Sequence, residues 1–242
     1  MKNKSKFRKL YIKRLIIRII IFIGVLVLYI FKPNSFNVVK GLNFIKEFSI
    51  LHILWLIWII EMVLKLCNIP SFWPLGSQKV FFKRFIPDKK LINKDLIKNL
   101  MKELNKDSIT VAIVWTIFVL IIDSLYLFHI VPYQIIVLFS VAFYVCDVIC
   151  IVAWCPFRVL IMRNKCCTTC RIFNWDHSMM FLPLIVIPGL YTYSLIVMAF
   201  IVLIVWEVSC ASHPERFMEK TNCALRCQNC KDKLCGKNGR NI

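Results

Sequence analysis

Apolar residues in this chain form long uninterrupted blocks, and most charged residues lie between the blocks. An α-helix needs about 20 apolar residues to cross the roughly 30 Å hydrocarbon core of a bilayer. The pattern therefore predicts an all-α integral membrane protein, a bundle of about five transmembrane helices. The predicted spans cover residues 15–31, 50–66, 109–130, 135–154 and 190–208.

The apolar block at residues 179–208 leaves the path of the chain open, because it is too long for one upright span and too short for two. Pro183, Pro188 and Gly189 interrupt it before the span at 190–208. If residues 179–189 only touch the interface, the tail that follows emerges opposite the N-terminus. If they form a re-entrant segment, the tail returns to the side of the N-terminus.

Polar segments flank and interrupt the predicted transmembrane bundle at 15–208. Residues 1–14 carry lysine and arginine but no acid, and the loop at 155–178 is also basic. The positive-inside rule predicts that both are cytoplasmic. The Cys-rich tail at 209–242 has seven Lys or Arg against three acids, which favours the same side.

Residues 91–104 place apolar side chains on one helical face and lysines elsewhere. This spacing predicts an amphipathic helix. Such a helix either lies at the membrane interface and contacts lipid, or packs on the cytoplasmic rim of the bundle.

Composition and charge support a multi-pass protein of the cell membrane. Of the 242 residues, 59% are hydrophobic, which is well above the usage of soluble domains. The net charge of +19 is dispersed at the ends of apolar blocks, without the interleaved aromatic residues of a single-strand nucleic-acid binder. We therefore expect a bilayer with anionic lipids as the partner, and no nucleic acid.

Four cysteines near the C-terminus have the spacing C-x3-C-x2-C-x4-C: Cys223, Cys227, Cys230 and Cys235. The first three resemble the loop with which radical SAM enzymes hold a [4Fe–4S] cluster, and Cys235 could be the fourth ligand. Only seven residues follow Cys235, too few for the barrel that binds SAM in those enzymes. Zinc is the alternative occupant, because four thiolates also satisfy tetrahedral Zn²⁺.

A second group of cysteines lies in the 155–178 loop: Cys155, Cys166, Cys167 and Cys170. A C-x2-C pair can direct two sulfurs at one metal or cluster. His177 and His213 are close to the two groups in sequence and are candidate auxiliary ligands. Cys167 and Cys170 could instead form a redox dithiol, as in the quinone-linked disulfide formers, which this chain resembles in span number and in having a C-x2-C pair beside the membrane.

Three acids lie inside predicted spans: Glu61, Asp123 and Asp147. An ionised side chain in hydrocarbon costs several kcal/mol, so these residues should face the bundle interior or water. They could form a proton or cation path. Alternatively, Glu61 pairs with Lys65 one turn away, and the aspartates are protonated and hydrogen-bonded.

The chain has no Gly-rich phosphate loop, no H-E-x-x-H and no G-x-S-x-G motif. The cysteine spacings favour a membrane electron-transfer component with Cys-ligated iron–sulfur centres and a redox or membrane-complex protein partner. The alternatives are a zinc-stapled scaffold or metal-responsive interaction protein, and a membrane thiol–disulfide oxidoreductase that uses Cys167 and Cys170. We interpret Cys146 and Cys150, inside an apolar helix, as small hydrophobic residues.

Overall fold

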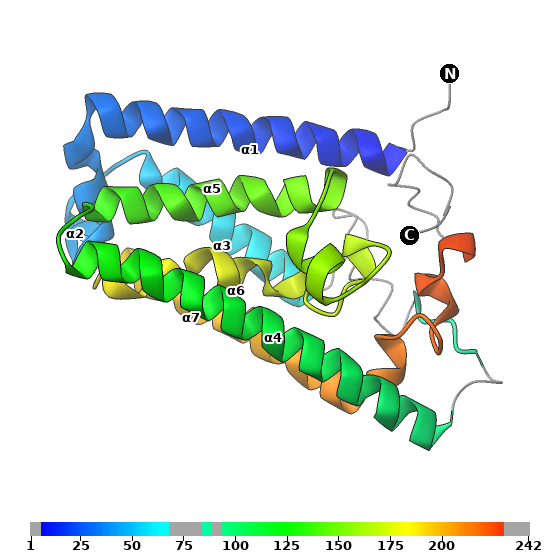
Figure 1. Ribbon diagram of the computed structural model, residues 1–242. Helices are drawn as coiled ribbons and strands as arrows, with labels where there is room; N and C mark the ends of the chain where they lie inside the picture. The colour runs from blue at the N-terminus through cyan, green and yellow to red at the C-terminus, as the bar shows by residue number, and fades with distance from the viewer. Residues whose placement is uncertain (1–5, 68–83, 89–92, 230–242) are drawn as a thin grey trace.

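The computed structural model describes residues 6–67, 84–88 and 93–229, which fold almost entirely as helices (Figure 1). Within these residues, β-pairing is limited to two isolated bridges. Short 3₁₀ and π-helical turns connect the α-helices. The α-helices are α1 (Lys6–Phe31), α2 (Asn43–Lys46), α3 (Leu51–Cys67), α4 (Lys94–Leu127), α5 (Tyr133–Val152), α6 (Asp176–Phe181) and α7 (Leu190–Ser212).

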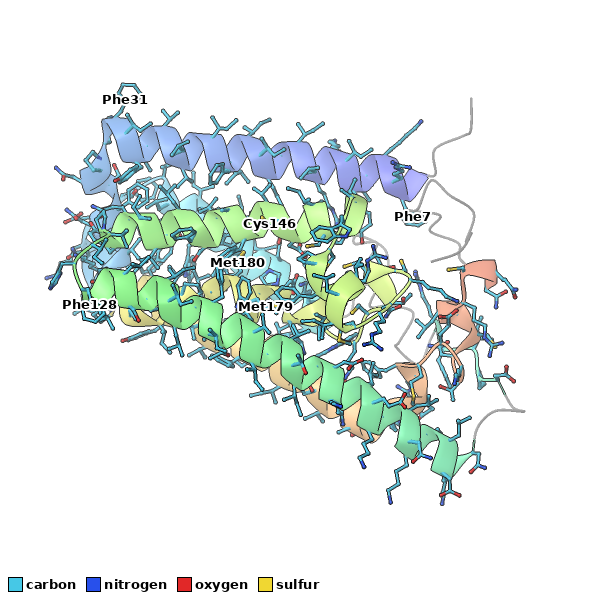
Figure 2. All side chains as sticks on the ribbon, viewed as in Figure 1. Phe7, Phe31, Phe128, Cys146, Met179 and Met180 are labelled. Atoms are coloured by element: carbon cyan, nitrogen blue, oxygen red, sulfur yellow. The ribbon has the colours of Figure 1, made fainter. Side chains whose placement is uncertain are left out.

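Four of these helices, α1, α4, α5 and α7, are long and apolar enough to cross a membrane. Large apolar side chains project from their outer faces, as Figure 2 shows, and Ile20, Ile117 and Val197 are more than half exposed. A soluble protein rarely exposes so much apolar surface, whereas lipid covers it without cost. The helices therefore fit an all-α, multi-pass membrane protein.

Connections gather at the two ends of the bundle (Figure 1). The hairpin end contains residues 32–50, 128–132 and 187–189, where the backbone of Gly41 donates to the carbonyl of Pro188 at 2.8 Å. The cysteine end contains residues 155–175 and 213–229, where Lys165 approaches Glu219 at 3.7 Å. The described parts of the two Cys-rich segments therefore lie at the same end, together with the start of α1.

The segment from α6 through the 3₁₀ turn η7 (Leu182–Val186) runs through the bundle between these two ends. Phe181 and Leu184 on this segment, and Ile187 directly after it, are at most 1% exposed. Gly189 lies where the chain reaches the hairpin end. A Cβ atom on Gly189 would lie 2.1 Å from the carbonyl oxygen of Val39, so the two backbones are in close contact. The interrupted block at 179–189 is thus packed inside the bundle, and α7 returns the chain to the cysteine end.

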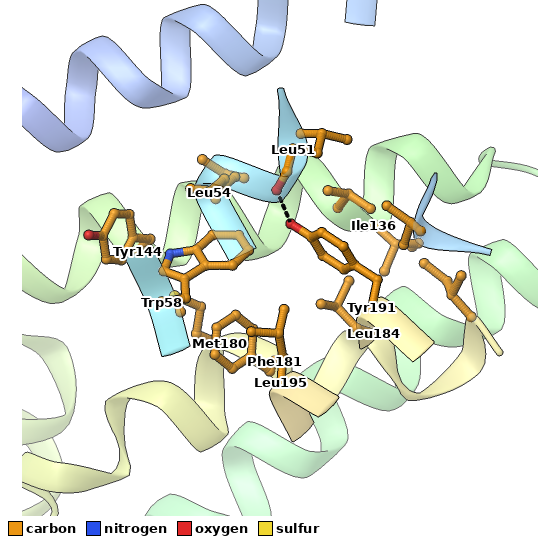
Figure 3. Packing of buried hydrophobic residues seen from close by; sticks show 14 of the residues in the cluster. Leu51, Leu54, Trp58, Ile136, Tyr144, Met180, Phe181, Leu184, Tyr191 and Leu195 are labelled. Atoms are coloured by element: carbon orange, nitrogen blue, oxygen red, sulfur yellow. Dashed lines mark hydrogen bonds between the residues drawn. The ribbon is translucent and has the colours of Figure 1, made fainter. Parts of the chain in front are cut away.

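The core lies where α3, α5, α6 and α7 meet (Figure 3). The ring of Trp58 packs edge-on against Phe181 at a centroid distance of 5.0 Å and against Tyr144 at 5.9 Å. The hydroxyl of fully buried Tyr191 donates to the carbonyl of Leu51 at 3.2 Å. This arrangement satisfies a phenol inside an apolar core and fixes α7 against α3.

Helix α4 starts after Asn93, whose side chain accepts a hydrogen bond from the backbone of Asp95 at 3.1 Å. This is an N-cap contact, and the helix then continues without a break to Leu127. Residues 94–104 of the predicted amphipathic helix and the following predicted span therefore belong to one helix. Leu91 and Ile92 lie outside the described residues.

Candidate functional site

Arg18 of α1 is buried between two acids from other helices. Its Nη1 donates to Asp147 of α5 at 2.7 Å, and its Nη2 lies 3.3 Å from Glu61 of α3. Nη1 also donates to the carbonyl of Tyr144 at 2.7 Å, and the hydroxyl of Tyr144 donates to Glu61 at 2.7 Å. The arginine thus satisfies two carboxylates in the bundle interior.

A second set of charges continues this arrangement toward the cysteine end. Lys65 forms an ion pair with Asp176 at the start of α6, and its Nζ lies 2.9 Å from Nδ1 of His177. Nε2 of His177 lies 3.7 Å from Glu61, which joins the two sets. We call these six residues the ionic network: Arg18, Glu61, Lys65, Asp147, Asp176 and His177.

The ionic network contains three carboxylates, two permanent cations and one histidine. Protonation of His177 therefore makes the network as a whole electrically neutral. Unpaired charges inside a bundle are strongly unfavourable, so each member depends on partners from other helices. Because α1, α3, α5 and α6 each contribute, the network holds four segments in one register.

The network includes two of the three acids predicted for an intramembrane path, Glu61 and Asp147. Asp123 is separate on α4, where it is 6% exposed and its Oδ1 has no hydrogen-bond partner among the described residues. The alternative pairing of Glu61 with Lys65 is replaced by two other pairs, in which Lys65 contacts Asp176 and Glu61 contacts Arg18. Arg18 and Asp176 are members of this site that the sequence did not predict. An arginine inside the run LIIRIIIF is the signal that could have identified it.

Three thiols meet where α5 ends, and we call Cys150, Cys155 and Cys167 the thiol cluster. All three residues line one apolar cavity. The neighbouring thiols of Cys150 and Cys167, with the backbone N–H groups of Arg158 and Phe157, hold the pKa of Cys155 well below that of an ordinary thiol. The neighbouring Cys155 and burial raise the pKa of Cys167. These opposite directions favour a thiolate at Cys155, with the proton on its neighbours.

Local backbone structure explains the position of this thiolate. Pro156 is followed by a single π-helical turn, Phe157–Ile161, whose first N–H groups have no partner inside the turn. These groups point toward Cys155, as at the N-terminal helix positions that stabilise reactive thiolates. A 3₁₀ turn at Cys167–Thr169 then brings Cys167 back to the cluster.

The loop that carries the thiol cluster is fastened to α7. Arg171 donates two hydrogen bonds to Glu207, and Nε1 of Trp175 donates to the same carboxylate at 2.7 Å. Nε1 of Trp206 donates to the carbonyl of Arg171 at 2.8 Å. Bidentate pairing with arginine is geometrically specific, so these contacts fix the position of the loop on the bundle.

An apolar cavity of about 560 Å³ opens beside the thiol cluster. Figure 2 places Cys146 of α5 across from Met179 and Met180 of α6, and all three line this cavity. Trp115, Phe118, Phe143 and Phe157 provide aromatic walls. Asp147 and Asp176 line both this cavity and a cavity of about 20 Å³ inside the ionic network. The two sites therefore share a wall of two carboxylates.

Of the other predicted metal ligands, Cys170 lines the same cavity as the thiol cluster, and burial raises its pKa to about 12. Cys166 contacts the hydroxyl of Thr168 at 3.2 Å, and Cys223 faces Asp88 at 3.9 Å. Cys227 is exposed. All ten cysteines in the described ranges are free thiols, and no three Cys, His, Asp or Glu side chains there are arranged to hold a metal ion.

Cys230 and Cys235 lie outside the described residues. His177 is a member of the ionic network, and His213 is partly exposed, 3.4 Å from Glu215. His177 thus has its partners in the ionic network, whereas His213 as an auxiliary ligand of the C-terminal cysteines stays a prediction. Cys150 is a member of the cluster that the sequence did not predict. A cysteine in an apolar helix usually packs as a small hydrophobic residue, and the sequence alone favours that interpretation of Cys150.

Comparison with known proteins found no matching family, no matching curated sequence and no matching solved structure.

Proposed function

We propose that this chain is a membrane thiol–disulfide oxidoreductase in which Cys155 is the reactive cysteine. The observation that carries the proposal is that Cys155, just before a helical turn, lines the same cavity as two further thiols, Cys150 and Cys167. Thiol exchange requires a thiolate to attack and a neighbouring thiol to resolve the mixed disulfide. The thiol cluster supplies both. The reacting pair that we propose, Cys155 and Cys167, differs from the pair of Cys167 and Cys170 that the C-x2-C spacing predicts.

The membrane arrangement that we propose has about five transmembrane helices, α1, α3, α4, α5 and α7, with the α6–η7 segment as an interrupted passage inside the bundle. The basic N-terminus and the basic 155–178 loop favour a cytoplasmic cysteine end. The C-terminal tail would then be cytoplasmic as well, because α7 ends beside that loop.

The reaction starts on a disulfide of a partner protein. The Cys155 thiolate attacks one sulfur of that disulfide, and the other sulfur leaves as a thiolate. Cys167 then loses its proton and attacks Cys155, which releases the second partner sulfur. The products are a Cys155–Cys167 disulfide and a reduced partner, so two electrons have moved from this chain to the partner.

Cys150 extends the exchange into the bundle. Its sulfur can attack Cys155 in the Cys155–Cys167 disulfide, which forms Cys150–Cys155 and returns the thiol of Cys167; the proton moves from Cys150 to Cys167. This isomerisation needs no added oxidant or reductant. It transfers the second sulfur of the disulfide from Cys167 of the loop to Cys150 near the end of α5.

Disulfide mapping tests the proposal. Reduced protein is treated with oxidised glutathione, quenched with acid, and digested without reduction for mass spectrometry. We expect the Cys155–Cys167 and Cys150–Cys155 cross-links, and we expect Cys155→Ser to remove both. Cys166→Ser is the matched control, because Cys166 is a loop thiol whose side chain contacts Thr168. A dominant Cys167–Cys170 cross-link, or unchanged cross-linking in Cys155→Ser, would contradict the assignment.

The same preparation, made without oxygen, tests the two metal hypotheses from the sequence. A Cys-ligated [4Fe–4S] cluster predicts iron, acid-labile sulfide and an EPR signal on reduction. A zinc-stapled tail predicts stoichiometric zinc without a redox signal. Either result, lost in Cys227→Ser and kept in Cys155→Ser, would assign a metal to the C-terminal cysteines and leave the thiol cluster as a separate site.

A further inference from the structure

A groove of about 980 Å³ runs between the first turns of α4 and the end of α7 at the cysteine end. Four lysines of α4 line one side: Lys94, Lys98, Lys102 and Lys106. Ile97 and Met101 provide an apolar floor, and Cys210 and Pro214 close the groove from the side of α7. The groove therefore combines a cationic edge with an apolar interior.

The lysines have a regular spacing of four residues. Successive lysines of such a series are about 6 Å apart along a helix, and they remain on one broad face. All four are exposed, and none is within ion-pair distance of a carboxylate in the part of the chain that the structure describes. An anion lying along this face would relieve the repulsion among four like charges.

The groove lies at the level where the membrane surface is expected. Helix α4 has 34 residues and is therefore about 51 Å long, well beyond the roughly 30 Å of hydrocarbon. Its first turns carry the lysines, and its apolar stretch begins at Ile109, which also lines the groove. The cationic edge thus faces the headgroup layer, and the apolar interior continues toward the hydrocarbon.

We propose that this groove binds an anionic phospholipid, with the phosphate on Lys98 and Lys102 and an acyl chain along Ile97 and Met101. The apolar floor is what distinguishes a phospholipid from a free phosphate, which would gain nothing from it. The inference is independent of the proposed thiol chemistry. It assigns a specific site to the anionic lipid that the net charge predicts.

Native mass spectrometry of the full chain in a zwitterionic detergent tests the inference. The protein is titrated with phosphatidylglycerol, and bound lipid is counted. Each lysine near anionic lipid contributes about a fivefold gain in affinity, so Lys98→Gln/Lys102→Gln should bind about twenty-five-fold more weakly. Lys9→Gln/Lys13→Gln is the matched control, because these exposed lysines have the same spacing on α1 at the same end of the bundle.

Two further probes identify the source of the anion. Phosphatidylcholine should bind the unaltered protein at least tenfold more weakly than phosphatidylglycerol, and glycerol phosphate alone should not compete at equal concentration. Equal binding of the two lipids would overturn the proposal. So would equal losses in the two double variants, or effective competition by glycerol phosphate. Melting temperatures of both variants, measured without added lipid, show whether a loss of binding reflects loss of the fold.

Discussion

The ionic network and the thiol cluster are neighbouring polar sites of opposite design. The network takes its members from α1, α3, α5 and α6, and each charge faces an opposite charge. The thiol cluster takes its members from one stretch, residues 150–167, and adjoins a cavity of about 560 Å³. The difference indicates that the network holds the helices together, whereas the cluster has open space beside it for the exchange that we propose.

The largest expected effect on stability comes from removing the centre of the network. Arg18→Gln leaves Glu61 and Asp147 without their shared cation in a buried site, and a broken buried ion pair costs about 3–5 kcal/mol. Unfolding in mixed micelles, followed by circular dichroism, measures the loss. Lys13→Gln on the exposed face of α1 is the control and should change the free energy of unfolding by less than about 0.5 kcal/mol. Equal effects of the two substitutions would show that the network does not hold the bundle.

A smaller effect is expected for the phenol that completes the network. Tyr144→Phe removes a 2.7 Å hydrogen bond to the Glu61 carboxylate, and bonds to charged groups contribute about 1.5–3 kcal/mol. Tyr133→Phe removes a 2.8 Å bond to the uncharged side chain of Asn37 at the hairpin end, where about 0.5–1.5 kcal/mol is expected. The same unfolding measurement ranks the two variants, and the reverse order would contradict a charged Glu61.

The sequence predicts the long apolar helices α1, α4, α5 and α7, because burial in lipid depends on the composition of each block alone. It does not predict the network, because pairing depends on which residues face one another after the helices pack. Arg18 lies near the start of the predicted span at 15–31, and Asp176 belongs to a polar loop, yet both are buried partners in the fold.

The thiol cluster shows the same limit at shorter range. Spacing identifies C-x2-C pairs, but a π-helical turn after Pro156 directs Cys155 toward Cys150 and Cys167 instead. A conformation that is rare in helical sequences changes which sulfurs meet. The sequence shows the cysteines, but which of them meet depends on the conformation of the backbone between them.

Substitution in the thiol cluster should separate chemistry from stability. Cys155→Ser keeps a hydrogen-bonding atom of similar size at a site that is 6% exposed, so we expect a loss of only about 1 kcal/mol. Exchange with a disulfide-bonded peptide, followed by the release of its thiols, should fall to background. If Cys155→Ser instead unfolds much of the protein, and the part that stays folded still exchanges disulfides, the thiol cluster would have the structural role that we assign to the ionic network.

The smallest expected effect is a change in pH dependence, and it tests the thiolate directly. The neighbouring thiols of Cys150 and Cys167 lower the pKa of Cys155, so we expect its thiolate to persist as the pH falls below the ordinary thiol value of about 8.5. Alkylation of folded Cys155 by iodoacetamide, measured by peptide mass spectrometry, should change less than about twofold between pH 9 and pH 6. In the chain unfolded with SDS, the rate should fall by roughly tenfold for each pH unit below 8.5, because the thiol then takes up a proton. If folded Cys155 follows the curve of the unfolded chain, the cluster does not stabilise a thiolate, and the reactive cysteine must be sought elsewhere among the thiols of the cysteine end.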